Sequence, residues 1–255
     1  MSAEGRERWE RGVLLASLAM ATALAWLVIA LHHDGSLAHG LLRARQGPAE
    51  LETFSIAALL WLAMAVGMML PPLLPWIVGF AALSRRSGED PVLHTHLFVL
   101  GYLAVWSVFS LGAAAVQVGI GHGLGSLDLH AGLGPKLGGA ALLLAGAFQL
   151  TPFKCGALNH CRSPISFLLA QWENGPAGAI RLGWRHGLHC LGCCWALMGL
   201  ALALGAMNLL WMAGLTVAIG LEKLAPHGRR WSLALGGALI AAGAWLLVAG
   251  GGLRA

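Results

Sequence analysis

The stretch from Trp184 to Met198, WRHGLHCLGCCWALM, concentrates side chains that bind metals. Its three cysteines, two histidines and one methionine are Cys190, Cys193, Cys194, His186, His189 and Met198. Residues three or four apart share one face of a helix, so a helix here would carry these side chains as one stripe. Thiolate, thioether and imidazole together favour soft or borderline metals, Cu(I) first and Zn(II) as the alternative.

Further candidate ligands lie in two other segments and are Cys155, His160, Cys161, Met68 and Met69. The methionines precede Pro71 and Pro72. Proline frees backbone carbonyls, and broken helices at membrane depth are tolerated mainly where they line a cavity or are buried in protein. We therefore expect these groups, together with Glu222, to converge with the cysteine-rich stretch into one metal site.

The spacing also predicts an order among the ligands. One helix offers a metal only two or three side chains, because those at i and i+4 meet and those at i+7 lie two turns away. Cu(I) accepts such low coordination by sulfur, provided that a neighbouring segment adds a ligand. We expect Cys190 and Cys194 as the central pair, Cys193 or His189 as the auxiliary ligand, and Met198 as a deeper, weaker ligand.

The composition indicates a membrane protein. Of the 255 residues, 58% are hydrophobic and 11% are charged, whereas soluble domains carry about 25% charged residues. The apolar residues form long blocks, each near the roughly 20 residues that cross a bilayer core. The sequence thus predicts an all-α, polytopic transmembrane helical bundle that forms a single domain over residues 1–255, with the lipid bilayer as its surroundings.

We expect about seven spans, near residues 11–31, 53–83, 92–120, 135–151, 187–204, 207–221 and 231–250, with the fifth and sixth separated at 205–208. With the N-terminus inside, twelve of the 16 Lys and Arg residues lie on the cytoplasmic side. This asymmetry is the positive-inside signal. It accounts for the basic character of the chain without a nucleic-acid partner, and with seven spans it places the C-terminus outside.

Several motifs resemble a bacterial family of uncharacterised integral membrane proteins, described as predicted metal-binding membrane proteins. They are MMLP from Met68, HCRSP from His160, GLHCLGCCWALM from Gly187, MNLLWM from Met207 and LEK from Leu221. The resemblance implies a multi-pass inner-membrane protein with a metal, often copper. The family pattern has a cysteine four residues before Cys161, where this sequence has Ala157 and instead carries Cys155, so a C-x3-C pair is missing.

Three classes of function remain. The first is a carrier that binds Cu(I) and hands it across the membrane or to a maturing metalloprotein, with His32, His33 and His39 at the far end of the route. A metal-delivering or metal-accepting protein and a second copy of the chain are its possible partners. The second is a thiol oxidoreductase using the C-x-x-C pair of Cys190 and Cys193. The third is a structural subunit of a membrane complex, so an enzymatic role is the less favoured reading.

Overall fold

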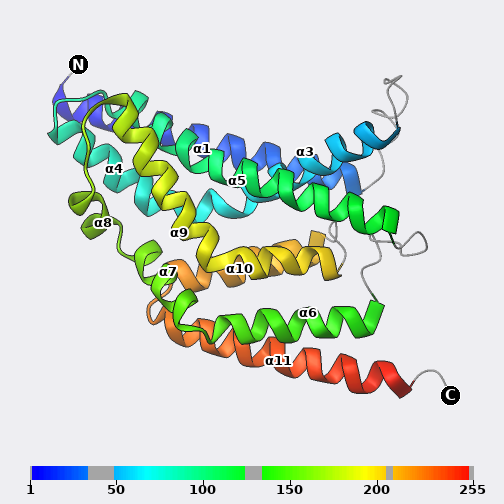
Figure 1. The fold of residues 1–255 in the computed structure, drawn as a ribbon. Helices are drawn as coiled ribbons and strands as arrows, with labels where there is room; N and C mark the ends of the chain where they lie inside the picture. Colours follow the sequence, from blue (N-terminus) through cyan, green and yellow to red (C-terminus); the bar gives the residue numbers. More distant parts are fainter. Residues whose placement is uncertain (1, 34–48, 124–133, 205–208, 253–255) are drawn as a thin grey trace.

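The chain folds entirely into α-helical structure in the computed structural model, which describes residues 2–33, 49–123, 134–204 and 209–252 (Figure 1). No strand occurs within those ranges. The helices are α1 (Ala3–His33), α3 (Ala49–Met69), the 3-10 turn η1 (Pro71–Leu73), α4 (Leu74–Arg86), α5 (Pro91–Gly123), α6 (Gly134–Gln149), α7 (Pro152–Arg162), α8 (Pro164–Ala170), α9 (Gly175–Leu204), α10 (Leu209–Leu224) and α11 (Gly228–Gly252). The predicted all-α class is confirmed.

Three of these helices, α1, α5 and α11, are long and apolar enough to cross a membrane. Two bent pairs pass the same test together. They are α3 with the segment from η1 to α4, bent by 43°, and α6 with α7, bent by 65°. The most apolar windows of α1 and α11 have mean hydropathies of 2.3 and 2.0, yet only 17% of each window is buried. Both helices therefore turn most of their apolar surface outward, as helices in contact with lipid do.

Seven spans were expected, whereas three of the described helices pass the span test, or five if each bent pair is one span, and neither α9 nor α10 is among them. Between the fourth and fifth expected spans, residues 152–186 form α7, α8 and the first three turns of α9. The long apolar run after residue 188 is described as α9 up to Leu204 and as α10 from Leu209, so the division expected at 205–208 is not tested. Residues 205–208 and His39 lie outside the described residues.

The proline break between α3 and α4 leaves backbone carbonyls that the protein interior satisfies. Pro71 has no N–H to offer the carbonyl of Gly67 four residues earlier, and the indole of Trp26 donates to this oxygen at 3.2 Å. The carbonyl of Met69 likewise accepts from the hydroxyl of Tyr102 at 3.3 Å. The carbonyls freed at the break thus find donors on α1 and α5.

Glycines allow two helix pairs to approach closely. A Cβ at Gly183 would fall on the backbone carbonyl of Phe98, and a Cβ at Gly187 would lie 2.9 Å from Val105. Gly183 and Gly187 have the spacing of small residues that lets helices approach closely, and this approach is present between α9 and α5. A second such contact joins α6 to α11, where a Cβ at Gly243 would meet the α6 backbone at 2.7 Å.

The helix ends fall into two groups (Figure 1). The start of α1, the end of α4, the start of α5 and the start of α9 lie at one end of the bundle, with α8 beside them. The ends of α5 and α11 and the start of α6 lie at the other end. Successive long helices therefore run in alternating directions.

Candidate metal site

Four of the five cysteines gather where α9 packs against α7. Cys190, Cys193 and Cys194 of α9 are each 1% exposed, and Cys161 of α7 is 6% exposed. The Sγ atoms of Cys161 and Cys193 lie 3.8 Å apart. The thiol of Cys190 interacts with those of the other three cysteines. All five cysteines of the chain are free of disulfides.

Met69 adds a thioether from the proline break of α3. Its Sδ lies 3.8 Å from the Sγ of Cys194. Met69 is fully buried, and it is the last residue of α3 before Pro71. We call Cys161, Cys190, Cys193, Cys194 and Met69 the sulfur cluster. The structure thus places sulfurs from α3, α7 and α9 together, as the predicted convergence requires.

Lys223 of α10 enters the same cluster, a position that was not predicted from the sequence. Its Nζ lies 2.9 Å from the Sγ of Cys190 and 3.7 Å from the Sδ of Met69. Tyr102 of α5 also contacts the Cys190 sulfur, at 3.0 Å through its hydroxyl. A buried ammonium requires a compensating anion, and the thiolate of Cys190 is the group in position to supply it.

The thiols nearest the α9 backbone are held by local bonds. Cys193 and Cys194 both donate to the carbonyl of Cys190, at 3.1 Å and 2.9 Å. Because these are weak thiol bonds to a backbone oxygen, rotation about one side-chain bond can exchange them for a metal.

His186 lies one turn before Cys190 on α9 and is 2% exposed. Its ring stacks on the indole of Trp76, with centroids 3.6 Å apart. Its Nδ1 is buried without a hydrogen-bond partner. Trp76 in turn donates to the carbonyl of Cys161 at 2.9 Å. A buried nitrogen without a partner is unusual, so His186 keeps one unused donor or acceptor atom beside the sulfur cluster.

His160 and His189 form a separate pair. Their rings stack with centroids 4.5 Å apart and an interplanar angle of 27°. His160 is exposed and His189 is half-buried. The two rings lie at the surface of the α7–α9 contact, one residue along the chain from Cys161 and Cys190 respectively.

The remaining predicted ligands take other positions. Cys155 points away from the other sulfurs and accepts from the guanidinium of Arg229 at 2.8 Å. Met68 and Met198 belong to the buried core, and none of the contacts above involves them. Glu222 does not reach the thiols.

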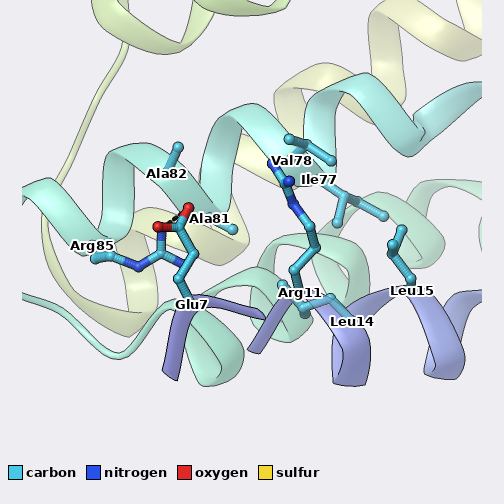
Figure 2. A pocket seen from close by; sticks show the side chains of 9 residues that line it. All are labelled: Glu7, Arg11, Leu14, Leu15, Ile77, Val78, Ala81, Ala82 and Arg85. Carbon is cyan, nitrogen blue, oxygen red and sulfur yellow. Dashed lines mark ion pairs between the residues drawn. The ribbon is translucent and has the colours of Figure 1, made fainter. Parts of the chain in front are cut away.

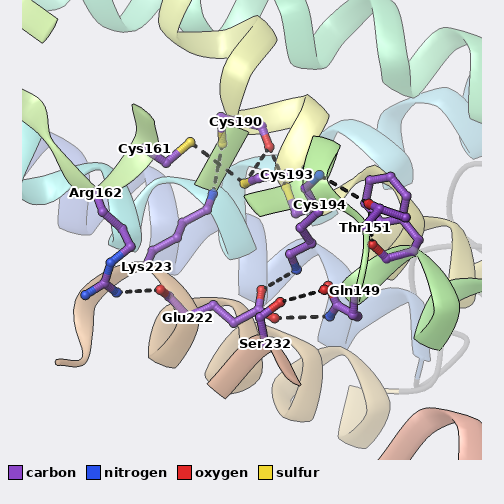
Figure 3. A network of polar contacts seen from close by, with 12 residues as sticks. Gln149, Thr151, Cys161, Arg162, Cys190, Cys193, Cys194, Glu222, Lys223 and Ser232 are labelled. Atoms are coloured by element: carbon purple, nitrogen blue, oxygen red, sulfur yellow. Dashed lines mark hydrogen bonds and ion pairs between the residues drawn. The ribbon is translucent and has the colours of Figure 1, made fainter. Parts of the chain in front are cut away.

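Glu222 instead centres a buried polar network (Figure 3). Its carboxylate accepts from the Nζ of Lys154 at 2.6 Å and from the side-chain amide of Gln149 at 3.1 Å. Its main-chain carbonyl accepts from Arg162 at 2.6 Å. These bonds tie α10 to α6 and α7, so they fix the helix that carries Lys223 against the helix that carries Cys161.

Among the described residues, no three His, Cys, Asp or Glu side chains are already arranged as a metal-binding group. The pocket between α1 and α4 offers no alternative, because its lining contains neither thiol nor imidazole (Figure 2). Its polar contact is the ion pair of Glu7 with Arg85 at 3.1 Å. The sulfur cluster therefore remains the part of the described chain with the strongest metal-binding chemistry.

The described chain is helical, and it combines apolar helices long enough to cross a membrane with a buried group of thiols. Such a group of thiols is a set of ligands that copper favours. Residues 58–246 match the sequence profile of the PpoB2 family, described as copper chaperones. The chain belongs to this family, and its role is therefore related to copper. No curated protein and no solved structure shows significant similarity to the chain.

Sequence reasoning missed Lys223 and Tyr102 as neighbours of the thiols. Lys223 was counted among the basic residues at the cytoplasmic ends of spans. The available signal was its position beside Glu222 at the end of an apolar helix, where two adjacent charges are costly unless each finds a partner.

Proposed function

We propose that the chain is a polytopic inner-membrane copper chaperone, a single domain that binds Cu(I) in the sulfur cluster and passes it to a protein acceptor. The observation that carries this proposal is the contact of sulfurs from three helices in a chain of the copper chaperone family. Thiolate and thioether select Cu(I). Copper is here the cargo of the protein.

Cys161 and Cys193 are the first two ligands in this proposal. Two thiolates 3.8 Å apart, each about 2.3 Å from a metal ion, subtend an angle of about 110° at that ion. This angle suits three or four ligands better than a linear pair. Cys190 is placed to supply the third, and Met69, Cys194 or the free nitrogen of His186 is near enough to complete the set after side-chain rotation.

The ligand order differs from the one expected from spacing alone. Cys190 and Cys194 share one helix, but the sulfur of Cys194 faces Met69 and that of Cys193 faces Cys161. A carrier benefits from ligands on separate helices, because a small relative movement of α7 and α9 opens the site. Release to an acceptor then needs no unfolding of either helix.

The decisive experiment uses full-length chain purified in detergent under reducing conditions and loaded with Cu(I). The wild type is expected to retain one Cu(I) per chain. The Cys161→Ser/Cys193→Ser variant should lose this copper, whereas Cys155→Ser should keep it, because Cys155 faces Arg229. Retention of one Cu(I) with unchanged affinity by the double variant would reject the site. Preferential retention of zinc would reject Cu(I) as the cargo.

A thiol oxidoreductase is the second candidate, and one observation favours it. The thiol sulfurs of Cys161 and Cys193 lie 3.8 Å apart on two different helices. Oxidation would join α7 to α9 through a disulfide. Alkylation and mass spectrometry of chain isolated from cells distinguish the two functions, since a carrier keeps both thiols reduced and an oxidoreductase shows the disulfide.

Membrane topology completes the proposal. The alternating directions of the long helices (Figure 1) and the distribution of Lys and Arg support seven spans with the N-terminus inside. The sulfur cluster then lies near the cytoplasmic face, where thiols stay reduced. Reporter fusions at the two termini should give opposite locations. The same location for both would reject the seven-span arrangement.

A further inference from the structure

We infer that His160 and His189 form a second, outer copper site that loads the sulfur cluster. The inference rests on the proposed function, since it supplies the step by which Cu(I) reaches the thiols. The ligand is a cuprous ion delivered by a donor that binds it more weakly than the thiols do. Imidazole nitrogen is a borderline ligand and suits copper.

The two imidazoles come from different helices and meet at the surface. His160 lies at the end of α7 and His189 lies in the first half of α9. Their ring centroids are 4.5 Å apart. Phe167 of α8 packs edge-on against both rings, at 6.2 Å from His160 and 5.5 Å from His189. Aromatic contacts therefore hold the two rings in place without hydrogen bonds to their nitrogens.

The ring nitrogens of this pair form no hydrogen bond within the described residues. The histidines at the start of α5 behave differently, because His94 and His96 each bond the backbone carbonyl four residues earlier, at 2.9 Å and 2.7 Å. Stacking alone does not require histidine, since two phenylalanines would pack as well. Two imidazoles with free nitrogens therefore lie close together and accessible at the surface, where rotation of either ring can direct a nitrogen to a metal ion.

The position of the pair connects solvent to the thiols. Each histidine precedes a cysteine of the sulfur cluster, His160 before Cys161 and His189 before Cys190. The histidines are accessible and the cysteines are buried. Copper bound by two imidazoles would move inward to stronger sulfur ligands in the next layer. In this exchange copper stays Cu(I), copper–nitrogen bonds are replaced by copper–sulfur bonds, and a proton on a receiving thiol leaves to water.

Removal of the outer site should slow the loading of Cu(I) but should not change the amount of Cu(I) that the chain retains. The variant His160→Phe/His189→Phe keeps two stacked rings against Phe167 but removes all four ring nitrogens. Transfer of Cu(I) from a coloured Cu(I)-chelator complex to the full chain in detergent is followed by stopped-flow absorbance. We expect loading to slow by roughly tenfold or more, with one Cu(I) per chain still retained at equilibrium. His96→Phe is the matched control and should load at the wild-type rate.

Three outcomes separate this inference from the proposed function. Wild-type loading rates in the double phenylalanine variant would overturn the outer site and leave the sulfur cluster intact. Loss of the retained copper in that variant, with its thermal unfolding unchanged, would make the histidines part of the inner site and would also overturn the inference. If the wild type itself retains no Cu(I), the proposed function fails.

The outer site can also be observed directly. In Cys161→Ser/Cys193→Ser chain, the inner site is removed, and Cu(I) should still shift the imidazole proton resonances of His160 and His189. Resonances that stay unchanged on addition of Cu(I) would contradict the inference, whatever the loading rates show.

Discussion

Replacing Lys223 by methionine tests whether the buried ammonium belongs to the copper site. The Nζ of Lys223 lies 2.9 Å from the Cys190 sulfur, and the residue is 8% exposed. Methionine keeps most of the length and volume of lysine but removes its charge. We expect Lys223→Met to weaken Cu(I) binding by about 10- to 100-fold, because a hydrogen bond to a charged group contributes about 1.5–3 kcal/mol and about 1.4 kcal/mol corresponds to a factor of ten.

The physical reason is the net charge of the loaded site. One Cu(I) bound by two thiolates carries one net negative charge, and three thiolates leave two. An uncompensated charge in a buried site is costly. The ammonium of Lys223 offsets it in the loaded state and balances the Cys190 thiolate in the metal-free state. Lys223→Arg keeps the positive charge and should therefore lose less affinity than Lys223→Met.

The assay is competition between the detergent-purified chain and a Cu(I) chelator of known affinity. Lys136→Met is the matched control, because Lys136 is exposed on α6, and it should leave the affinity unchanged. Surface charges are screened over about 8 Å at physiological salt, whereas a buried pair is not. The affinity loss in Lys223→Met should therefore persist at high salt. Equal affinities of wild type and Lys223→Met, with equal thermal stability, would refute the reasoning.

Two further predictions concern the packing that holds the site, and thermal unfolding followed by tryptophan fluorescence measures both. Gly183→Ala places a methyl group on the backbone of α5 and should destabilise the chain by about 1–3 kcal/mol. The control on the same helix is Gly199→Ala, whose added methyl group points into open space and should stabilise the chain by up to about 1 kcal/mol. Equal melting temperatures for the two variants would contradict the close approach of α9 and α5. Glu222→Gln leaves the ammonium of Lys154 buried without its 2.6 Å partner and should destabilise by about 3–5 kcal/mol. A wild-type melting temperature for Glu222→Gln would mean that the pair is not buried.

The sequence predicted the helices and the break at Pro71 because both depend on local chemistry. Apolar run length sets where a span begins and ends, and proline ends a helix whatever surrounds it. The glycine spacing of Gly183 and Gly187 was informative for a similar reason. Without side chains at these positions, two helix backbones can approach along one stripe, although the sequence could not identify α5 as the partner.

The pairing of ligands could not be predicted in the same way. Helical spacing shows which side chains of α9 share a face, but not how α9 is rotated against α7 and α3. A rotation of about 100°, the angle between successive residues of a helix, decides whether Cys193 or Cys194 meets Cys161. The buried position of Lys223 was not predicted because a lysine at the end of an apolar helix normally extends to the membrane surface. In the structure, α10 packs against the proline break, and this packing directs Lys223 inward.

The departure at Ala157 now has a structural consequence. Ala157 lies one turn before Cys161 on α7. A Cβ added at Gly192 of α9 would lie 3.6 Å from the methyl group of Ala157. A cysteine at this position would therefore face α9 beside the sulfur cluster, whereas Cys155 faces Arg229.

The sulfur cluster and its neighbouring ammonium come from four helices, and the proposed carrier function depends on this arrangement. Met69 reaches the cluster because the proline break ends α3 there, Cys161 arrives on the short helix α7, and Lys223 arrives on α10. None of these segments holds the metal alone, since each offers a single ligand or charge. The site forms only when α3, α7 and α10 pack around α9. In the proposed carrier, a modest shift of one short helix would lower the number of ligands, and copper would leave for an acceptor while the long helices remain in place.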